Sequence, residues 1–169
     1  MKKMKNSLAF ALAILLAVSF MGIFGAPCPA AGNDDDAGLQ EVYDFLQGCG
    51  HYYLATVEDG QPRVRPFGSL AIFEGKIYFQ TGKIKDVSKQ MAANPKIEIC
   101  AFDGKGMWIR VQAVAVDDPR REAKQFLLDA HPSLKNMYSA DDDNTQVLYL
   151  KDAAARFYSF AGEPRIVKF

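Results

Sequence analysis

Residues 52–81 read YYLATVEDGQPRVRPFGSLAIFEGKIYFQT, and this stretch carries the strongest signal for the fold. Apolar and polar residues alternate along it, which is the period of a β-strand with one buried face. Turn residues at 59–60, 68–69 and 74–75 divide it into four strands, at 52–58, 62–67, 70–73 and 76–81. Such short turns join antiparallel neighbours, so the pattern excludes a doubly wound parallel sheet.

The remainder of the chain adds more strands and a few small helices. Strands are predicted at 96–102, 107–116, 147–150 and 155–160, with an edge strand at 164–169. Helices are predicted at 36–48 behind an Asp36 cap, at 84–93, and from an Asp118 cap to His131. Strands at short intervals with little helix indicate a mainly β protein, a compact antiparallel barrel with helical decoration.

The first 31 residues differ from the rest. Three lysines precede an almost wholly apolar run from Leu8 to Phe24, and small residues follow up to Ala31. These are the parts of a secretory signal peptide, so we expect cleavage near Ala31 and a periplasmic or extracellular protein without membrane attachment. The alternative is an uncleaved membrane anchor, because the run approaches the length that spans a bilayer. Residues 32–36 then form a polar linker, and 37–169 form one domain.

Composition excludes several classes of function. The chain has 20 basic and 20 acidic residues, and residues 1–31 hold three of the lysines, so the mature chain carries a net charge of −3. Such a chain has no basic excess for binding nucleic acid. The two histidines and the absence of a paired Cys/His spacing argue against a metal site. Cys49 and Cys100 could form a disulfide or remain two buried thiols, and the sequence does not decide between these.

Arg63 and Arg65 form the first of three candidate binding clusters, in the run Arg63-Val64-Arg65-Pro66-Phe67. Alternation places both arginines on one face of a strand and Val64 on the other. Two guanidinium groups side by side favour an anion such as phosphate between them. The alternative is a solvated face on which each arginine pairs with a carboxylate.

The second cluster is Thr81-Gly82-Lys83-Ile84-Lys85 together with Lys89, where a strand ends and a helix begins. Unpaired N–H groups at a helix start attract anions, but for this cluster taken alone an ordinary capped helix with solvated lysines is the better explanation. The third cluster is Trp108 with Arg110 and Gln112 on one strand face, which is either a ligand or subunit contact or an outward-facing surface.

Together, the order of RVRPF, IYFQTGKIKDVSKQM and KIEICAFDGKGMWIRVQA resembles the pyridoxamine 5′-phosphate oxidase-like split β-barrel proteins, which bind flavin mononucleotide (FMN). The resemblance covers roughly residues 52–160 and is nearest to small bacterial members. It implies an FMN-binding protein and a homodimer that holds the flavin between its subunits. Haem and deazaflavin are alternative ligands, because proteins that use them resemble this barrel too.

The resemblance also implies which residues contact the cofactor. Those along the flavin and its phosphate are Arg63, Val64, Arg65, Pro66, Phe67, Gln80, Thr81, Lys85 and Lys89. Trp108 and Arg110 lie on the strand that reaches the flavin from the neighbouring subunit. Trp108 stands where relatives often carry Gln, which suggests stacking in place of a hydrogen bond.

The expected activity is an oxidoreductase on an unknown small substrate, with no catalytic side chain identified. Residues 162–169 lack the Trp of the segment with which true pyridoxamine phosphate oxidases grip their substrate, so we expect no vitamin B6 oxidation. The alternative is an exported protein that binds flavin or haem without turnover, since a fold does not determine a function.

Overall fold

The structure is a computed structural model that describes residues 34–169. The predicted signal peptide lies outside these residues. Gly32–Phe169 make up one compact unit. Among the described residues, no helix has both the length and the apolar character needed to cross a membrane.

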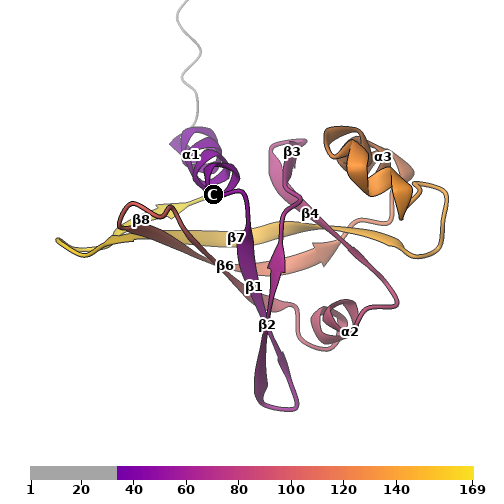
Figure 1. Cartoon of the computed structure of the whole chain (residues 1–169), viewed down its shortest axis with the longest axis horizontal. Helices are drawn as coiled ribbons and strands as arrows, with labels where there is room; N and C mark the ends of the chain where they lie inside the picture. The colour runs from indigo at the N-terminus through magenta and orange to yellow at the C-terminus, as the bar shows by residue number, and fades with distance from the viewer. Residues whose placement is uncertain (1–33) are drawn as a thin grey trace, which may run out of the picture. The chain divides into compact units, whose positions relative to one another are not determined.

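The described part of the chain contains eight strands and three α-helices (Figure 1). The strands are β1 (Tyr52–Glu58), β2 (Gln61–Phe67), β3 (Ala71–Phe73), β4 (Lys76–Gly82), β5 (Lys96–Phe102), β6 (Met107–Asp117), β7 (Thr145–Ser159) and β8 (Arg165–Lys168). The helices are α1 (Asp34–Gly48), α2 (Asp86–Ala93) and α3 (Arg121–Ala130), and a 3₁₀ turn, η1 (Pro132–Asn136), follows α3. The predicted strands are therefore confirmed, with most ends within two residues, except that those at 147–150 and 155–160 are parts of one strand, β7.

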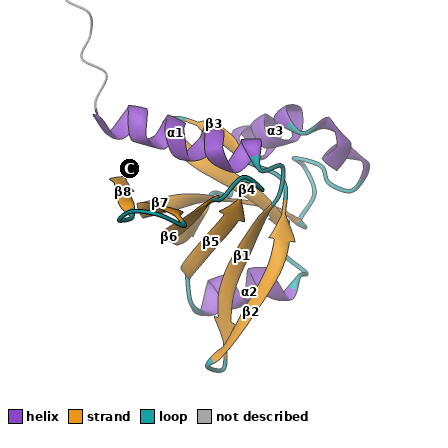
Figure 2. Cartoon of the chain, turned by 60° about the vertical axis from the view of Figure 1, so that its left-hand side comes forward, coloured by secondary structure: helices purple, strands orange, loops and turns teal. Residues whose placement is uncertain are grey.

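All strands pair antiparallel in one sheet of order β2-β1-β5-β6-β7-β4-β3, with β8 added beside β7. Figure 2 shows β7, β6, β5, β1 and β2 side by side in this order. The mainly β split-barrel fold class is confirmed, although the sheet does not close, since β2 and β3 at its two ends are not paired with each other.

The main core lies on the inner face of this sheet. Alternate residues of the central strands, such as Leu54, Ile99 and Val111, are fully buried there under α1. Helix α1 contributes its apolar stripe to the same core, with Val42 and Leu46 almost inaccessible to solvent. Burial of each such side chain stabilises the fold by about 2 kcal/mol. The opposite, outer face of β1, β2, β5 and β6 has no helix on it.

Three local expectations were wrong. Helix α1 begins at Asp34, two residues before the predicted Asp36 cap. Helix α3 begins at Arg121, because the Asp118 side chain is buried and bonds to Tyr78 and Arg120 in place of capping the helix. The two last long strands are one strand, β7, whose pairing with β6 shifts register between Gln112 and Val114. Asp152 has a positive φ of 52° beside that shift, so a β-bulge replaces the predicted break.

Candidate functional site

A pocket of about 330 Å³ lies between β4, the β2–β3 connection and η1, and we name it the β4–η1 pocket. The end of β2 contributes Pro66 and Phe67, and the β2–β3 connection contributes Gly68 and Ser69. Gln80 lies on β4, and Lys85 precedes α2. The remaining lining residues come from the end of α3 and from η1 and its exit: His131, Ser133, Leu134, Met137 and Tyr138. Four of the residues predicted to contact a cofactor, Pro66, Phe67, Gln80 and Lys85, therefore line one pocket.

Gln80 is the most informative of these residues. Its side chain is 5% exposed, yet neither its amide nitrogen nor its amide oxygen has a hydrogen-bond partner within the described residues. A buried amide without partners costs about 1–3 kcal/mol, and such groups in folded proteins call for an explanation. A polar ligand in the β4–η1 pocket would supply the missing partners.

Lys85 brings a positive charge to the same pocket. It occupies the N-cap position of α2, and no side chain caps that helix. The Lys85 ammonium lies 5.7 Å from the centre of the Tyr138 ring and forms no ion pair with a described carboxylate. A free cation beside an uncapped helix start is a favourable place for an anion.

The two arginines of β2 differ in their surroundings. Arg63 pairs with Glu58, its Nη2 lying 2.9 Å from Oε2, as a solvated arginine does. Arg65 has no ion pair among the described residues, and its guanidinium donates to Thr56 Oγ1 at 2.8 Å and to Gln90 Oε1 at 2.7 Å. Partial burial, and then the neighbouring Arg63 charge, lower the pKa of Arg65. Of these two arginines, Arg65 is thus the one without a carboxylate at ion-pair distance.

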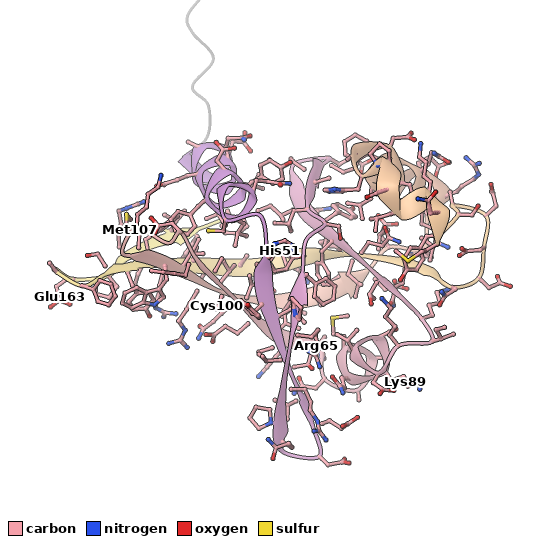
Figure 3. The ribbon with its side chains drawn as sticks, in the orientation of Figure 1. His51, Arg65, Lys89, Cys100, Met107 and Glu163 are labelled. Atoms are coloured by element: carbon pink, nitrogen blue, oxygen red, sulfur yellow. The ribbon has the colours of Figure 1, made fainter. Side chains whose placement is uncertain are left out.

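Figure 3 shows Arg65 on β2, close to α2, and Lys89 on that helix. Both arginines lie on the same face of β2, as predicted, and this is the inner face, because Arg65 pairs with Leu54 and Arg63 with Thr56 in the register. Lys89 is bound to Asp86 on the helix surface at 3.3 Å and does not line the β4–η1 pocket. Thr81 is buried next to Gln80, and its hydroxyl has no partner.

Trp108 and Arg110 lie elsewhere in this chain, on the outer face of the sheet. The Trp108 ring stacks on Tyr158 with centroids 5.2 Å apart, and Arg110 pairs with Glu98. Hydrogen bonds from Arg110 lower the pKa of Glu98. Val64 faces the same outer side, opposite Ala55. These residues cannot reach the β4–η1 pocket of their own chain, so their predicted contact with the flavin requires a second chain.

The outer face also carries exposed apolar side chains and a shallow hollow. Tyr53, Val64 and Phe102 are 53%, 66% and 53% exposed, far more than is usual for such residues in a sheet. The hollow, of about 480 Å³, is lined by residues of β1, β2, β5, β6 and β7, among them Val57, Lys96 and Gln112. None of its lining side chains carries a buried amide without a hydrogen-bond partner, which is the feature that distinguishes the β4–η1 pocket. We therefore place the candidate cofactor site in the latter.

Sequence reasoning missed the part of the pocket that comes from His131, Ser133 and Tyr138. These residues follow a helix and share no motif with β2 or β4, and η1 itself was not predicted. The His131-Pro132 pair was noticed only as the end of α3. Cys49 and Cys100 are both free thiols in the structure.

Residues 39–159 match the family model of pyridoxamine 5′-phosphate oxidase. The chain belongs to the pyridoxamine 5′-phosphate oxidase family, as the resemblance indicated. Within it, the chain is 44% identical to a NimC/NimA family protein from Clostridium acetobutylicum, with a TM-score of 0.78, over 81% of this chain and 96% of that one. No curated protein sequence matches the chain significantly.

Two more distant solved structures share the fold. An FMN-binding, pyridoxamine 5′-phosphate oxidase-related protein from Nostoc punctiforme is 18% identical, with a TM-score of 0.52, over 81% of this chain and 89% of that one. A haem-binding protein from Mycobacterium smegmatis is 16% identical, with a TM-score of 0.57, over 85% of this chain and 60% of that one. The fold thus accommodates both ligands in different proteins.

Proposed function

We propose that this protein is an FMN-binding oxidoreductase that acts on a small substrate at the β4–η1 pocket. The observation that supports this most strongly is the buried, unpaired amide of Gln80 beside the free cation of Lys85. Flavin-binding proteins of the same fold support the choice of cofactor.

The chemical groups that line the β4–η1 pocket match those needed to bind FMN. The pyrimidine edge of a flavin offers both hydrogen-bond donors and acceptors, which an amide such as that of Gln80 can satisfy on both atoms. Phe67, Leu134 and Met137 provide apolar surface for a flat ring. Lys85 and the start of α2 suit a phosphate, and Arg65, which precedes Pro66 of the lining but does not itself line the pocket, is a candidate for a second cation.

The same residues fit haem less well. Haem iron needs an axial ligand, most often a histidine nitrogen. His131 is the histidine that lines the β4–η1 pocket, and its Nε2 already contacts the Leu70 backbone, at 2.8 Å from the oxygen and 3.1 Å from the nitrogen. Only Nδ1 of His131 is left as an iron ligand, whereas Gln80 and Lys85 both suit a flavin, so we favour FMN. A deazaflavin is distinguished from FMN by its absorption spectrum.

Bound FMN would supply the electron transfer. The chain's own contribution is to hold the phosphate with Lys85 and Arg65, to orient the ring through Gln80, and to exclude water with the apolar residues of η1. The substrate then enters from the solvent side of the pocket.

We also propose that two copies pair through the outer face of the sheet. This would bury the exposed Tyr53, Val64 and Phe102 and bring Trp108 and Arg110 of one chain toward the pocket of the other. An isologous two-fold contact is the commonest way for identical chains to cover such a surface.

Titration with FMN tests the proposed function. The protein lacking residues 1–31 should bind FMN, show a flavin absorption band, and pass electrons from dithionite to a panel of quinones and nitroaromatic compounds. A protein that binds FMN but reduces none of these is a flavin carrier, the alternative function. A colourless protein that ignores FMN in calorimetry contradicts the proposal altogether.

Export is a separate proposal, which rests on the residue pattern of positions 1–31. Mass spectrometry of the protein after expression of the full chain measures the cut directly. A mature protein that begins near Gly32 is expected, and an intact N-terminus in the membrane fraction would mean an uncleaved anchor.

A further inference from the structure

His131 lies at the end of α3, where the chain turns into η1, and it lines the β4–η1 pocket. The sequence contains one other histidine, His51, which is exposed and does not line this pocket. The other titratable side chains of the lining are Lys85 and Tyr138, whose cation and ring lie against each other.

The ring of His131 is held by one nitrogen. Nε2 lies 2.8 Å from the Leu70 carbonyl oxygen and 3.1 Å from the Leu70 amide nitrogen. One nitrogen cannot donate and accept at once, so the tautomer decides which contact is a hydrogen bond. The carbonyl contact is the shorter, and it is also the contact that a protonated imidazolium keeps, because a cation can only donate.

This anchoring leaves the second nitrogen free. Within the described residues, no hydrogen bond involves Nδ1 of His131. If Nε2–H donates to Leu70, Nδ1 can take up or release a proton while the ring stays in place. A backbone carbonyl that fixes the tautomer in this way is a common arrangement for histidines that exchange protons.

We propose that His131 is a catalytic acid of this protein and delivers a proton from Nδ1 to the substrate in the β4–η1 pocket. The inference rests on the proposed function. A quinone that has gained two electrons and one proton is a hydroquinone anion, and it needs one further proton on its second oxygen. The Nδ1–H bond breaks, the O–H bond forms, and solvent then reprotonates Nδ1.

The first test reads the tautomer without any turnover. In ¹⁵N-labelled protein freed of any affinity tag, only His51 and His131 give imidazole signals. We expect Nε2 of neutral His131 to carry the proton and Nδ1 to be unprotonated, with and without FMN. The spectrum of His131→Gln assigns the signals. The opposite tautomer, with the proton on Nδ1, overturns the proposal.

The second test measures proton delivery. The FMN complex is reduced with dithionite without oxygen and mixed with a benzoquinone at a series of pH values. In the wild type, the rate should fall as pH rises through the His131 titration followed in the same protein by NMR. His131→Gln should lose about 10²-fold or more of the rate and lose that pH dependence. The matched control His51→Gln should keep both.

The outcomes separate the inference from the proposed function. A wild type that passes electrons at a rate unrelated to the His131 titration overturns the inference and leaves the oxidoreductase intact. A wild type that does not bind FMN ends both. If His131→Gln fails to fold, the tautomer and the pH profile of the wild type still decide.

Discussion

Gln80 and Gln146 sit on adjacent strands, β4 and β7, but face opposite sides of the sheet. Gln80 lies across from Val147, and Gln146 lies across from Thr81. Both side chains are buried and have unpaired amide atoms, yet only Gln80 lines the β4–η1 pocket. Comparing the two residues therefore separates the loss of stability caused by a buried, unpaired amide from the contribution of that amide to ligand binding.

Replacing Gln80 with Met, which is similar in shape and has no amide, should stabilise the protein without ligand by about 1 kcal/mol. The same change should weaken FMN binding, because the partner for the ring is gone. Urea unfolding and FMN titration measure the two effects. Gln146→Met, the matched control, should stabilise the protein and leave FMN binding unchanged. Loss of FMN binding in both variants would show that the β4–η1 pocket is not the cofactor site.

Arg65→Ala and Lys85→Ala should weaken FMN far more than riboflavin, which lacks the phosphate. A charge-assisted contact contributes about 1.5–3 kcal/mol, so the expected loss is about ten- to a hundredfold in affinity for FMN. Arg63→Ala is the control with the smaller effect, because Arg63 is already neutralised by Glu58. Equal losses of FMN and riboflavin would indicate damage to the fold, and the double variant of Arg63 and Arg65 tests whether one arginine replaces the other.

At the scale of elements, a buried polar link ties the segment before α3 to β4. The Tyr78 hydroxyl donates to Asp118 Oδ2 at 2.9 Å, and Arg120 binds both Asp118 and Glu74. Hydrogen bonds from Arg120 lower the pKa of Asp118 to about 2. Burial, followed by the bond to Asp118, raises the pKa of Tyr78 to about 12. This link sets where α3 begins, and thereby where His131 and η1 lie.

Tyr78→Phe should reduce stability at pH 8, and the deficit should shrink as pH rises from about 10 to about 12. The folded state holds the Tyr78 proton more tightly than the unfolded chain, in which a tyrosine has a pKa near 10. The stabilisation that comes from this proton is therefore complete below about pH 10 and is lost progressively between about pH 10 and pH 12. The difference in free energy of unfolding should narrow by on the order of 2 kcal/mol. Urea unfolding at pH 8, 10 and 12 measures this, and a difference that does not change with pH contradicts it.

At the scale of the whole molecule, the outer face of the sheet exposes apolar side chains that no other part of the described chain covers. Val64→Glu places a charge at its most exposed apolar residue. If two chains pair through this face, the variant should be a monomer in light scattering and should bind FMN more weakly than the wild type. Ala37→Glu adds the same charge to α1, on the other side of the sheet, and should leave the dimer intact. A wild type that is monomeric with FMN bound would refute the pairing.

The sequence by itself determined where the strands lie along the chain and which of them are joined by short turns. Alternation from Tyr52 to Thr81 and the turn residues between act locally, so they predict β1 to β4 without knowledge of the rest of the chain. The same local rule placed Arg63 and Arg65 on one face. It also identified Pro66, Phe67, Gln80 and Lys85 as candidates, with help from the family resemblance.

Only the tertiary structure decided which of these candidates share a pocket and which third element completes it. Pairing of β4 with β7, and the position of α3 set by Asp118, bring His131 beside Gln80 across 50 residues of chain. Likewise, Arg63 and Arg65 look equivalent in sequence. In the structure, Glu58 forms an ion pair with Arg63, and Arg65 has no ion pair among the described residues. Periodicity reports which face a side chain occupies, whereas its partners depend on contacts between distant segments, which no local pattern encodes.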